Sequence, residues 1–512
     1  MIRSLLVAVV AAGPAAAQDV TLTSRDGAIE VSGTLLTFDG EFYRVDSAFG
    51  ALTIAADGVA CTGPGCPDLS DFVAEARLVG ATVLAETLLP ALIEAFALDR
   101  GFDLEIEIVD DTTRIYTLAR ADQTIAARFT LTAATSEDGF LALLNRDADL
   151  ALTLREPLDL EIRAAQSAEV GDLSLARRAR IVALDALVPI VARANPVDRI
   201  TPEGLAGVYT GMIGSWADLG GPDAPITLHL PADASGLAQD FSARVLAGSI
   251  LPLAGDIVRH DDPRDLAEAV ARDPFAIGIA TLSSIGNARA LALSGSCGFA
   301  ISATPETLKS EDYPLTAPLF VYTPARRLPP LVRDFLDFFE TARAERVVRR
   351  AGYVSQEIMR AGLSDQGERL ANAVLAAGDE VDLDDLQRMI ARMTGTARLS
   401  PTFRFAGGST DLDTPSLSSL SRLATAIEQG EFDGRTLIFV GFSDSAGPAA
   451  ANLRLSRNRA DAVRQAVIEA AGAADLDRVR FRVAGFGEAL PLACDDSDWG
   501  AGINRRVEVW LD

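Results

Sequence analysis

The pattern that most constrains the fold is an alternation of strand-like and helix-like runs between residues 76 and 354. Strand-like runs such as FDLEIEIV and IVALDALVPIVA are interleaved with helix-like runs such as ITPEGLAGVYTG and LAQDFSARVLAG. This alternation indicates βα units and an α/β architecture. Because about 280 residues are too many for one hydrophobic core, we expect this region to form two lobes.

The segments on either side have different patterns. Residues 18–70 alternate apolar and polar positions in short runs separated by DG and FG pairs, which predicts a small antiparallel β module. Residues 357–399 are rich in helix formers and are predicted to be a helical connector. Residues 400–512 show strand, helix, strand, helix and two strands, which predicts a compact α+β domain. The expected fold class is therefore multidomain, α/β plus α+β.

The first residues have the features of an export signal. Residues 1–17 place one arginine before about ten apolar residues and end at a small-residue A-x-A site, which predicts a cleavable signal peptide. No later stretch approaches the ~20 uncharged residues that a membrane helix needs. We therefore expect an exported mature chain without a transmembrane segment.

Composition narrows the function classes. The chain has 72 acidic and 46 basic residues and a formal net charge of -26, which disfavours nucleic acid as a partner. A serine triad needs a histidine base, and neither His229 nor His260 lies next to a nucleophile motif. A Cys297 nucleophile in SGSCGF is conceivable, but a buried or bridged thiol is the simpler interpretation. We expect no enzyme activity, no metal and no cofactor.

The four cysteines fit an exported protein, in which disulfides are chemically permitted. Cys61 and Cys66, in CTGPGC, are close enough to close a tight loop, and a disulfide is favoured over a metal site because histidines are so few. Cys297 and Cys494 either remain buried free thiols or pair across domains.

Several separated motifs in the middle of the chain occur in a familiar order. They are DLALTLREPL, the run IVALDALVPIVARANPVDRITPEGLAGVYTGMIGSWADLGGPDAPI, AIGIATLSSIGNARALAL and YPLTAPLFVYT. Residues 76–354 therefore resemble the phosphate-type periplasmic solute-binding proteins, which implies the two-lobed type 2 periplasmic-binding fold. Proteins of this kind hold an oxyanion in a cleft between lobes with helix N-termini and hydroxyl groups.

Candidate solute-binding residues lie where strands pass into helices. Thr82 and the pair Ser235 and Gly236 occupy such positions, although each hydroxyl could also be a plain helix N-cap. Thr153 and Arg155 match the family's polar turn after a strand on the ligand side.

The second loop of the family's site departs from its usual pattern. A sequence like R-A-D-G-S-G-T is expected there, and this chain has PADASGL at residues 231–237, with Asp233 as its remaining charged candidate. The arginine and the terminal threonine are missing, which costs anion affinity. Phosphate is thus one candidate ligand, and a different small anion or no ligand are the alternatives.

The last segment contains five further motifs in order. They are TFRFAGGSTDLD, GFSDSAG, NLRLSRNRADAV, GFGEALP and NRRVEV. Residues 400–512 therefore resemble the C-terminal, OmpA-like peptidoglycan-binding domain of outer membrane protein A, with a βαβαββ order of elements. The resemblance implies attachment to the diaminopimelate side chain of cell-wall peptide stems.

Diaminopimelate presents an ammonium and a carboxylate on one carbon, so its receptor needs a carboxylate and a guanidinium at a fixed separation. Asp444 and Arg459 match the family's two ligand-gripping positions, Asp444 for the ammonium and Arg459 for the carboxylate. Asn452 lies on the same polar helix face, and Arg505 resembles the family's arginine that is either structural or at the edge of the site. The alternative is that Asp444 caps the loop and Arg459 is solvated or forms a structural ion pair.

Other residues near these motifs receive lesser roles. Arg454, Arg457 and Arg506 are expected to be solvated. Phe442 stands where relatives have a polar aromatic residue and is expected to alter the pocket rim. Gly408 stands where some relatives place a side chain that contacts the ligand.

Together these features predict a non-enzymatic binding protein in the periplasm of a Gram-negative bacterium. Its middle module would bind a small, phosphate-like oxyanion, and its tail would anchor it to peptidoglycan and associate it with the cell wall or the outer membrane. The alternative is a wall-anchored structural or signalling protein whose middle module has lost solute binding and contacts an envelope protein partner.

Overall fold

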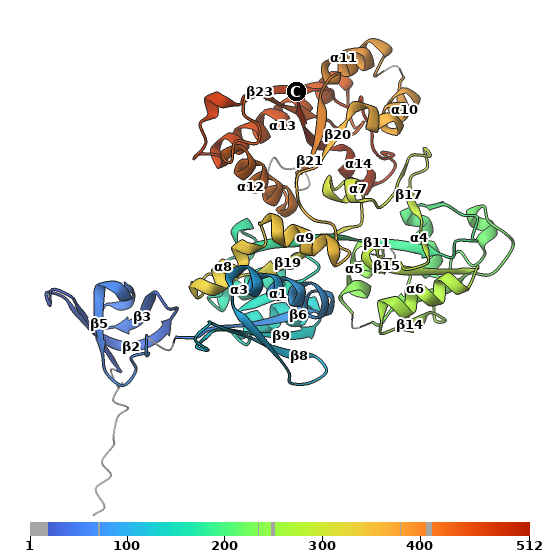
Figure 1. The fold of residues 1–512 in the computed structure, drawn as a ribbon. Helices are drawn as coiled ribbons and strands as arrows, with labels where there is room; N and C mark the ends of the chain where they lie inside the picture. Colours follow the sequence, from blue (N-terminus) through green and yellow to red (C-terminus); the bar gives the residue numbers. More distant parts are fainter. Residues whose placement is uncertain (1–18, 70–71, 234, 247–250, 379, 406–411) are drawn as a thin grey trace, which may run out of the picture. The chain divides into compact units, whose positions relative to one another are not determined.

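The computed structural model describes residues 19–69, 72–233, 235–246, 251–378, 380–405 and 412–512 (Figure 1). The predicted signal peptide at residues 1–17 and Gly408 lie outside these ranges. Within them, no helix has the length and apolar character that crossing a membrane requires. The chain divides into two compact units. Unit 1 contains the residues up to Arg77, Phe96–Leu131 and Arg326–Phe338, and unit 2 contains Leu78–Ala95, Thr132–Ala325 and Phe339–Asp512.

Unit 1 begins with the predicted antiparallel β module. Its strand order is β4-β3-β2-β1-β5, and the strands are β1 (Val20–Ser24), β2 (Glu30–Phe38), β3 (Phe42–Ser47), β4 (Gly50–Ala55) and β5 (Val59–Thr62). The side chains of Val20, Leu22, Tyr43 and Val45 form its small core. The expected Cys61–Cys66 disulfide is present at the end of β5. Such a bridge helps a module of this size, which buries little apolar surface.

The rest of unit 1 belongs to the α/β region. It contains the antiparallel hairpin of β7 (Asp103–Ile108) and β8 (Thr113–Ala119) and the helix α8 (Pro330–Phe338). The rings of Phe96 and Phe129 both pack against Phe335 of α8, with centroids 5.3 and 5.1 Å apart.

Unit 2 contains the sheet path β14-β13-β15-β11-β19-β10 and the last four residues, 78–81, of β6, which pairs with β10. The strands are β6 (Ala74–Ala81), β10 (Leu150–Thr153), β11 (Ala179–Val191), β13 (Thr227–Pro231), β14 (Val258–His260), β15 (Ala276–Thr281) and β19 (Thr316–Tyr322). The long strand β11 is almost wholly buried. Its first half pairs with β19 and its second half with β15, so β11 runs through both lobes. The predicted two-lobed α/β architecture is confirmed.

Each lobe has its own helices. The first lobe, which contains β10, carries α2 (Ser136–Leu144), α3 (Asp159–Ser167) and α9 (Ala342–Arg350). The second lobe carries α4 (Pro202–Tyr209), α5 (Gly236–Val245), α6 (Pro263–Arg272) and α7 (Pro305–Lys309). A small sheet of β12 (Arg199–Ile200), β17 (Ala292–Ser294) and β18 (Ala300–Ile301) completes the second lobe, and the β17–β18 hairpin contains Cys297.

The tail domain of unit 2 is built on a five-stranded sheet of order β20-β21-β24-β22-β23. The strands are β20 (Arg360–Gly362), β21 (Ala397–Arg404), β22 (Thr436–Gly441), β23 (Arg480–Gly485) and β24 (Arg506–Leu511). One face packs on α12 (Thr414–Glu428) and α13 (Ala449–Ala470) through Leu437 and Phe439. Ile438 and Val440 point the other way, because successive side chains of a strand alternate between faces. The expected βαβαββ order is present, with a short helix α14 (Asp498–Asn504) before the last strand.

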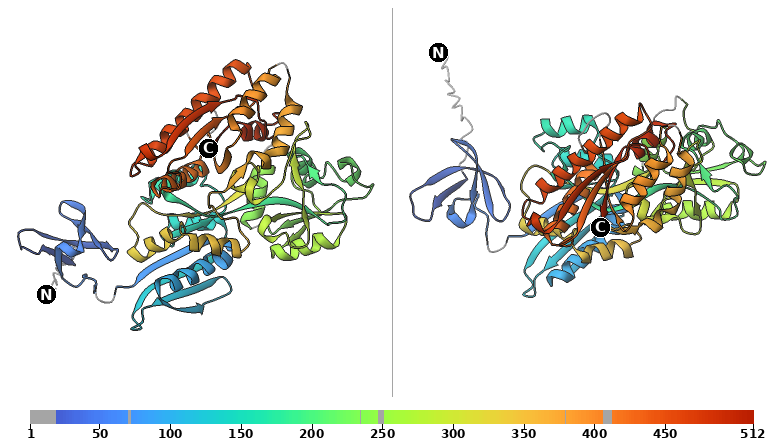
Figure 2. Two further views of the ribbon diagram at one scale, coloured as in Figure 1. Left: turned by 45° about the horizontal axis from the view of Figure 1, so that its top comes forward. Right: turned by 90° about the horizontal axis from the view of Figure 1, so that it is seen from above.

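The segment expected to be a helical connector, residues 357–399, contains two helices, α10 (Gly367–Ala376) and α11 (Leu383–Met393). It also contains β20, which pairs with β21 as the edge of the tail sheet. Both helices pack on the sheet face opposite to α12 and α13 (Figure 2), and Leu386, Met389 and Met393 are buried there. An apolar stripe on a helix has to be covered, and here the tail sheet covers it. The segment is therefore a layer of the tail domain.

Candidate functional site

The tail site forms at the end of β22, where a loop containing Asp444 leads into α13. α13 passes very close to this strand end, since a Cβ atom on Gly441 would lie only 1.9 Å from the carbonyl oxygen of Ser456. Glycine at position 441 therefore permits the approach. Asp444 from the loop and Arg459 from the helix are in this way brought into one electrostatic cluster with Arg505, which directly precedes β24.

Asp444 is held by Arg505. Nη1 of Arg505 donates a hydrogen bond to Oδ2 of Asp444 over 2.6 Å, and the side chains are 33% and 13% exposed. Across the described parts of the chain, Oδ1 of Asp444 has no hydrogen-bond partner. The sequence predicted both residues for this site, and the structure places them in direct contact.

Arg459 has no such partner. Its Nη1 atom is buried and makes no hydrogen bond to any residue that the structure describes. The guanidinium lies over the ring of Phe405, with its central carbon 5.1 Å from the ring centroid. Burial lowers the pKa of Arg459, the charge of Arg505 lowers it further, and Asp444 acts in the opposite direction. A buried N–H of a cation without an acceptor costs free energy.

Asn452 has a different position from the one expected of a ligand contact. Its side chain is 4% exposed, and Nδ2 donates to Glu488 Oε2 over 3.0 Å and to the carbonyl oxygen of Gly447 over 3.5 Å. Burial raises the pKa of the Glu488 carboxyl group. Asn452 therefore joins the start of α13 to the loops around the site.

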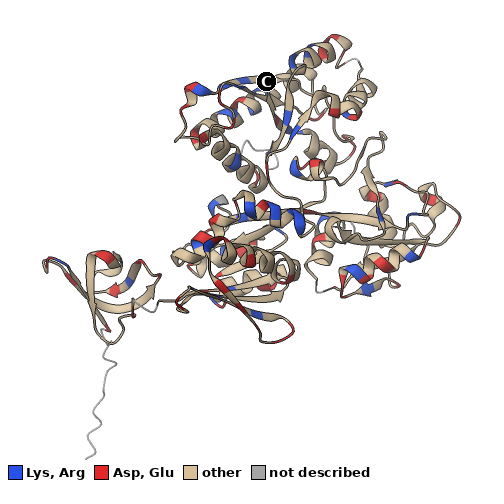
Figure 3. Ribbon diagram, viewed as in Figure 1, with Lys and Arg blue, Asp and Glu red and all other residues tan. Residues whose placement is uncertain are grey.

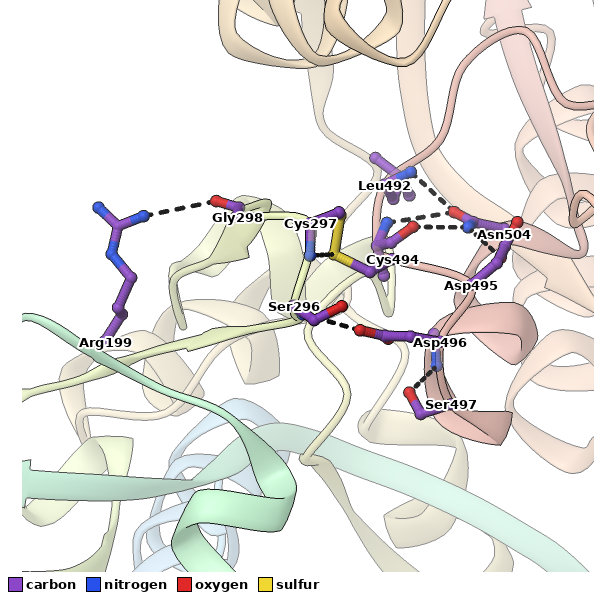
Figure 4. The surroundings of a disulfide bond; sticks show 12 residues. Arg199, Ser296, Cys297, Gly298, Leu492, Cys494, Asp495, Asp496, Ser497 and Asn504 are labelled. Carbon is purple, nitrogen blue, oxygen red and sulfur yellow. Dashed lines mark hydrogen bonds between the residues drawn. A yellow bond between two sulfur atoms is a disulfide. The ribbon is translucent and has the colours of Figure 1, made fainter. Parts of the chain in front are cut away.

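Two residues that the sequence interpretation missed organise the site. Asp495 accepts a hydrogen bond from the backbone N–H of Ser445 over 2.7 Å. It also accepts one from Nδ2 of Asn504 over 2.7 Å (Figure 4). Oδ1 of Asn504 accepts the backbone N–H groups of Leu492 and Ala493. The local signal was present, because Asn504 opens the NRRVEV motif and Asp495 follows Cys494 in the chain.

Two minor expectations for this region were wrong. Arg506 is fully buried rather than solvated; it donates to Glu508 over 2.7 Å and to the carbonyl oxygen of Leu490 over 2.9 Å. Burial lowers its pKa to about 10. Phe442 is 1% exposed and packs in the core under α10 and α11, because it continues the strand alternation of Val440. It therefore does not form the pocket rim.

Buried ion pairs connect the tail domain to the second lobe. Asp312, which follows α7, receives two hydrogen bonds from Arg398 over 2.6 and 3.1 Å and one from Arg404 over 3.3 Å. Burial alone would raise the pKa of Asp312, but the charge of Arg398 outweighs it and holds the pKa below its usual range. Glu508 lies 3.5 Å from Nε of Arg398 and extends the cluster. Charged residues are otherwise interspersed over the helices (Figure 3).

Two of the predicted solute segments, the turn of Thr153 and Arg155 and the start of α5, adjoin Ser136 at the start of α2. Oγ of Ser136 accepts the backbone N–H of Leu154 over 3.1 Å, which ties it to the turn of Thr153 and Arg155. A Cβ atom on Gly236 would lie 3.3 Å from the same Oγ atom, so the start of α5 is adjacent. Ser136 was missed by the sequence interpretation, although TSEDG at residues 135–139 has the strand-to-helix hydroxyls that pointed to Ser235.

The hydroxyl groups of the solute site are all engaged within the chain. Thr82 donates to the carbonyl oxygen of Ala134 over 3.3 Å, and Thr153 to that of Arg155 over 2.9 Å. Ser235 is the N-cap of α5 and accepts the backbone N–H of Ala238 over 3.1 Å. The Thr153 and Ser235 bonds are those of an ordinary turn and helix cap, whereas the Thr82 bond joins two segments that lie 52 residues apart in the chain.

The charged groups of the solute site are engaged as well. Arg155 forms a bidentate pair with Glu161, with bonds of 2.7 and 2.8 Å and with side chains that are 18% and 14% exposed. The hydrogen bond with Glu161 raises the pKa of Arg155. Asp233 is 80% exposed and pairs with Arg259 over 2.6 Å. A carboxylate of the chain thus occupies the guanidinium that would hold an oxyanion.

Comparisons with known proteins agree with both resemblances. Residues 108–343 match the PBP superfamily domain, and residues 404–505 match the OmpA family. Protein SphX of Synechococcus elongatus is 26% identical over 43% of this chain and 64% of its own length. The probable lipoprotein YiaD of Escherichia coli is 29% identical over 30% of this chain and 62% of its own length. The chain thus spans less than two thirds of either curated relative.

Among solved structures, an ABC-type phosphate transport receptor from Vibrio cholerae aligns with 55% of this chain and 99% of its own. The sequence identity is 19% and the TM-score is 0.43. The two matched domain families are non-enzymatic binding domains, in line with the expectation from the sequence.

Proposed function

The chain combines a PBP superfamily domain with an OmpA family domain, and from this premise we propose that it is a peptidoglycan-anchored periplasmic binding protein of a Gram-negative bacterium. The anchor is the site of Asp444, Arg459 and Arg505. Its ligand is the amino-acid centre of diaminopimelate in the peptide stems of the cell wall.

The observation that carries this proposal is the buried Nη1 atom of Arg459, for which the described residues offer no acceptor. A ligand carboxylate would supply the acceptor and form a charge-assisted hydrogen bond there. The ligand ammonium would bind Oδ1 of Asp444, since Arg505 engages only Oδ2. An anion alone satisfies Arg459 but is repelled by Asp444, so the pair selects a zwitterion.

The test is binding of a diaminopimelate-containing stem peptide, measured by calorimetry. We expect Arg459→Ala and Asp444→Ala to weaken binding at least tenfold, because each removes a charge-assisted bond. Arg454→Ala is the matched control, since Arg454 is an exposed arginine on the same helix α13. Wild-type affinity in both site variants would refute the assigned site.

For the middle module, the Arg155–Glu161 pair favours the second candidate function, in which free oxyanion binding has been lost. A solute anion would have to displace Glu161 from a guanidinium that it holds with two bonds. Thermal unfolding of the whole protein with millimolar phosphate, sulfate and nitrate tests this. We expect no change in the midpoint with any of them. A rise that grows with the concentration of one anion would reinstate solute binding.

A further inference from the structure

The loop at residues 492–497 connects the second lobe to the peptidoglycan site. On one side, Cys494 forms a disulfide with Cys297 in the β17–β18 hairpin of the second lobe (Figure 4). Asp496 also accepts the backbone N–H of Ser296 over 2.8 Å. The packing is tight, since a Cβ atom on Gly295 would lie 2.5 Å from the sulfur of Cys494. The loop is therefore fixed to the hairpin covalently and by hydrogen bonds.

On its other side, the same loop contacts both chain segments that carry the site. Asp495 accepts the backbone N–H of Ser445, which directly follows Asp444. Asp495 also accepts a hydrogen bond from Nδ2 of Asn504, which directly precedes Arg505. One carboxylate thus joins the two neighbours of the Asp444–Arg505 pair, and it lies next to the cysteine that is anchored in the second lobe.

We propose that Asp495 is a positioning residue of the peptidoglycan site, and that the Cys297–Cys494 disulfide holds it in place from the second lobe. This inference rests on the proposed function. It means that the solute-binding module is a structural part of the wall-binding site, so the tail domain binds its ligand best when it is attached to that module.

The physical reason is the exposure of the loop that carries Asp444. Ser445, Ala446, Gly447 and Pro448 are all exposed, so few packing contacts restrict this segment. Segments with few buried contacts open at low free energy. A carboxylate that accepts the Ser445 N–H orders the loop before the ligand arrives, and a site ordered in advance loses less entropy on binding. The disulfide in turn limits the freedom of the loop that carries this carboxylate.

The first test is Asp495→Asn in the full-length protein. Both carboxylate oxygens accept hydrogen bonds, and asparagine would turn one of them into a donor that faces another donor. We expect about tenfold weaker binding of the stem peptide, with a thermal midpoint within a few degrees of wild type. The matched control is Asp433→Asn, which removes an exposed tail carboxylate paired with Arg478 near the opposite end of β22 and should leave binding unchanged.

The second test is the double variant Cys297→Ser/Cys494→Ser, compared with Cys61→Ser/Cys66→Ser. Each removes one disulfide, and the first of these bonds joins the neighbour of Asp495 in the chain to the second lobe. We expect about threefold weaker binding for the first pair and wild-type binding for the second. Hydrogen exchange of the peptide that contains residues 443–447, without ligand, should be faster in Asp495→Asn and in the first pair only.

The outcomes separate this inference from the proposed function. If wild type does not bind the stem peptide, the proposed function fails and the inference fails with it. If wild type binds and both Asp495→Asn and the first cysteine pair bind equally well, the inference alone is overturned. If only the cysteine pair binds like wild type and its exchange is unchanged, the coupling to the second lobe is wrong. A loss of affinity with faster exchange at residues 443–447 supports it.

Discussion

Two arginines at the two binding sites differ in what surrounds them. Arg155, in the solute module, is held by Glu161 with two hydrogen bonds. Arg459, in the tail, has a buried Nη1 atom without an acceptor in the described chain. A paired arginine contributes to the stability of the free protein, whereas an arginine without an acceptor keeps its binding capacity for a ligand. The difference is the one expected if the proposed function is right, with an unused solute site in the middle module and a ligand site in the tail.

The largest effect is expected where the two regions are joined. Asp312→Ala leaves the buried guanidinium groups of Arg398 and Arg404 without their common carboxylate, which should cost about 3–5 kcal/mol of unfolding free energy. Urea unfolding measures it. Asp461→Ala is the control, because Asp461 is 53% exposed and pairs with Arg464 on the surface of α13. Equal stability of the two variants would show that the buried pairs do not join the domains.

Arg155 and Arg459 should also differ in how much each contributes to the unfolding free energy. Arg155→Ala should lower the unfolding free energy by about 1.5–3 kcal/mol, because Glu161 is left mostly buried without its cation. Arg459→Ala should cost less than about 1 kcal/mol, since the attraction of Asp444 is opposed by the repulsion of Arg505 and the contact with the Phe405 ring is the main loss. The double variant Arg155→Ala/Glu161→Ala should recover part of the loss. Equal losses of unfolding free energy in the two single variants would show that Arg155 does not stabilise the free protein more than Arg459 does.

Glu311, beside Asp312, adds a pH dependence to the junction. Burial raises its pKa to about 8, with a contribution from Asp413. The folded protein therefore binds a proton that the unfolded chain releases near its ordinary pKa of 4.5. Stability from this group is present below that pH and is lost as the pH rises through 8. Glu311→Gln should raise the unfolding free energy, measured by urea denaturation, by a few kcal/mol at most at pH 9 and leave it unchanged at pH 4. If the unfolding free energies of wild type and variant changed with pH in the same way, the assigned role of Glu311 would be contradicted.

The smallest effect is expected when the Arg155 guanidinium is freed from its ion pair with Glu161. Glu161→Gln keeps the size of the side chain but removes the negative charge that pairs with Arg155. Phosphate at millimolar concentration should then raise the thermal midpoint by a few degrees relative to the same variant without phosphate, while wild type does not respond. The control is Glu169→Gln on the surface, where the carboxylate is 86% exposed. An unresponsive Glu161→Gln protein would mean that the module lacks an anion site even when Arg155 is free.

The sequence predicted local features well. The alternation of strands and helices gave the α/β region, and the two sets of motifs located both domains. The Cys61–Cys66 bridge followed from a separation of 5 residues. These features depend on periodicity and on near neighbours in the chain, and both can be read without knowing which faces pack.

Only the tertiary structure decided the long-range partners. Asp444 pairs with Arg505, 61 residues away, and Cys297 with Cys494, 197 residues away. Glu161 holds Arg155, and Arg506 is buried rather than solvated. In each case the residue type permits several partners, and the choice depends on which loops and faces the packed sheets bring together. The sequence thus predicted the charged groups of the proposed wall site, and the packing determined that Asp444 pairs with Arg505 while Nη1 of Arg459 has no acceptor among the described residues.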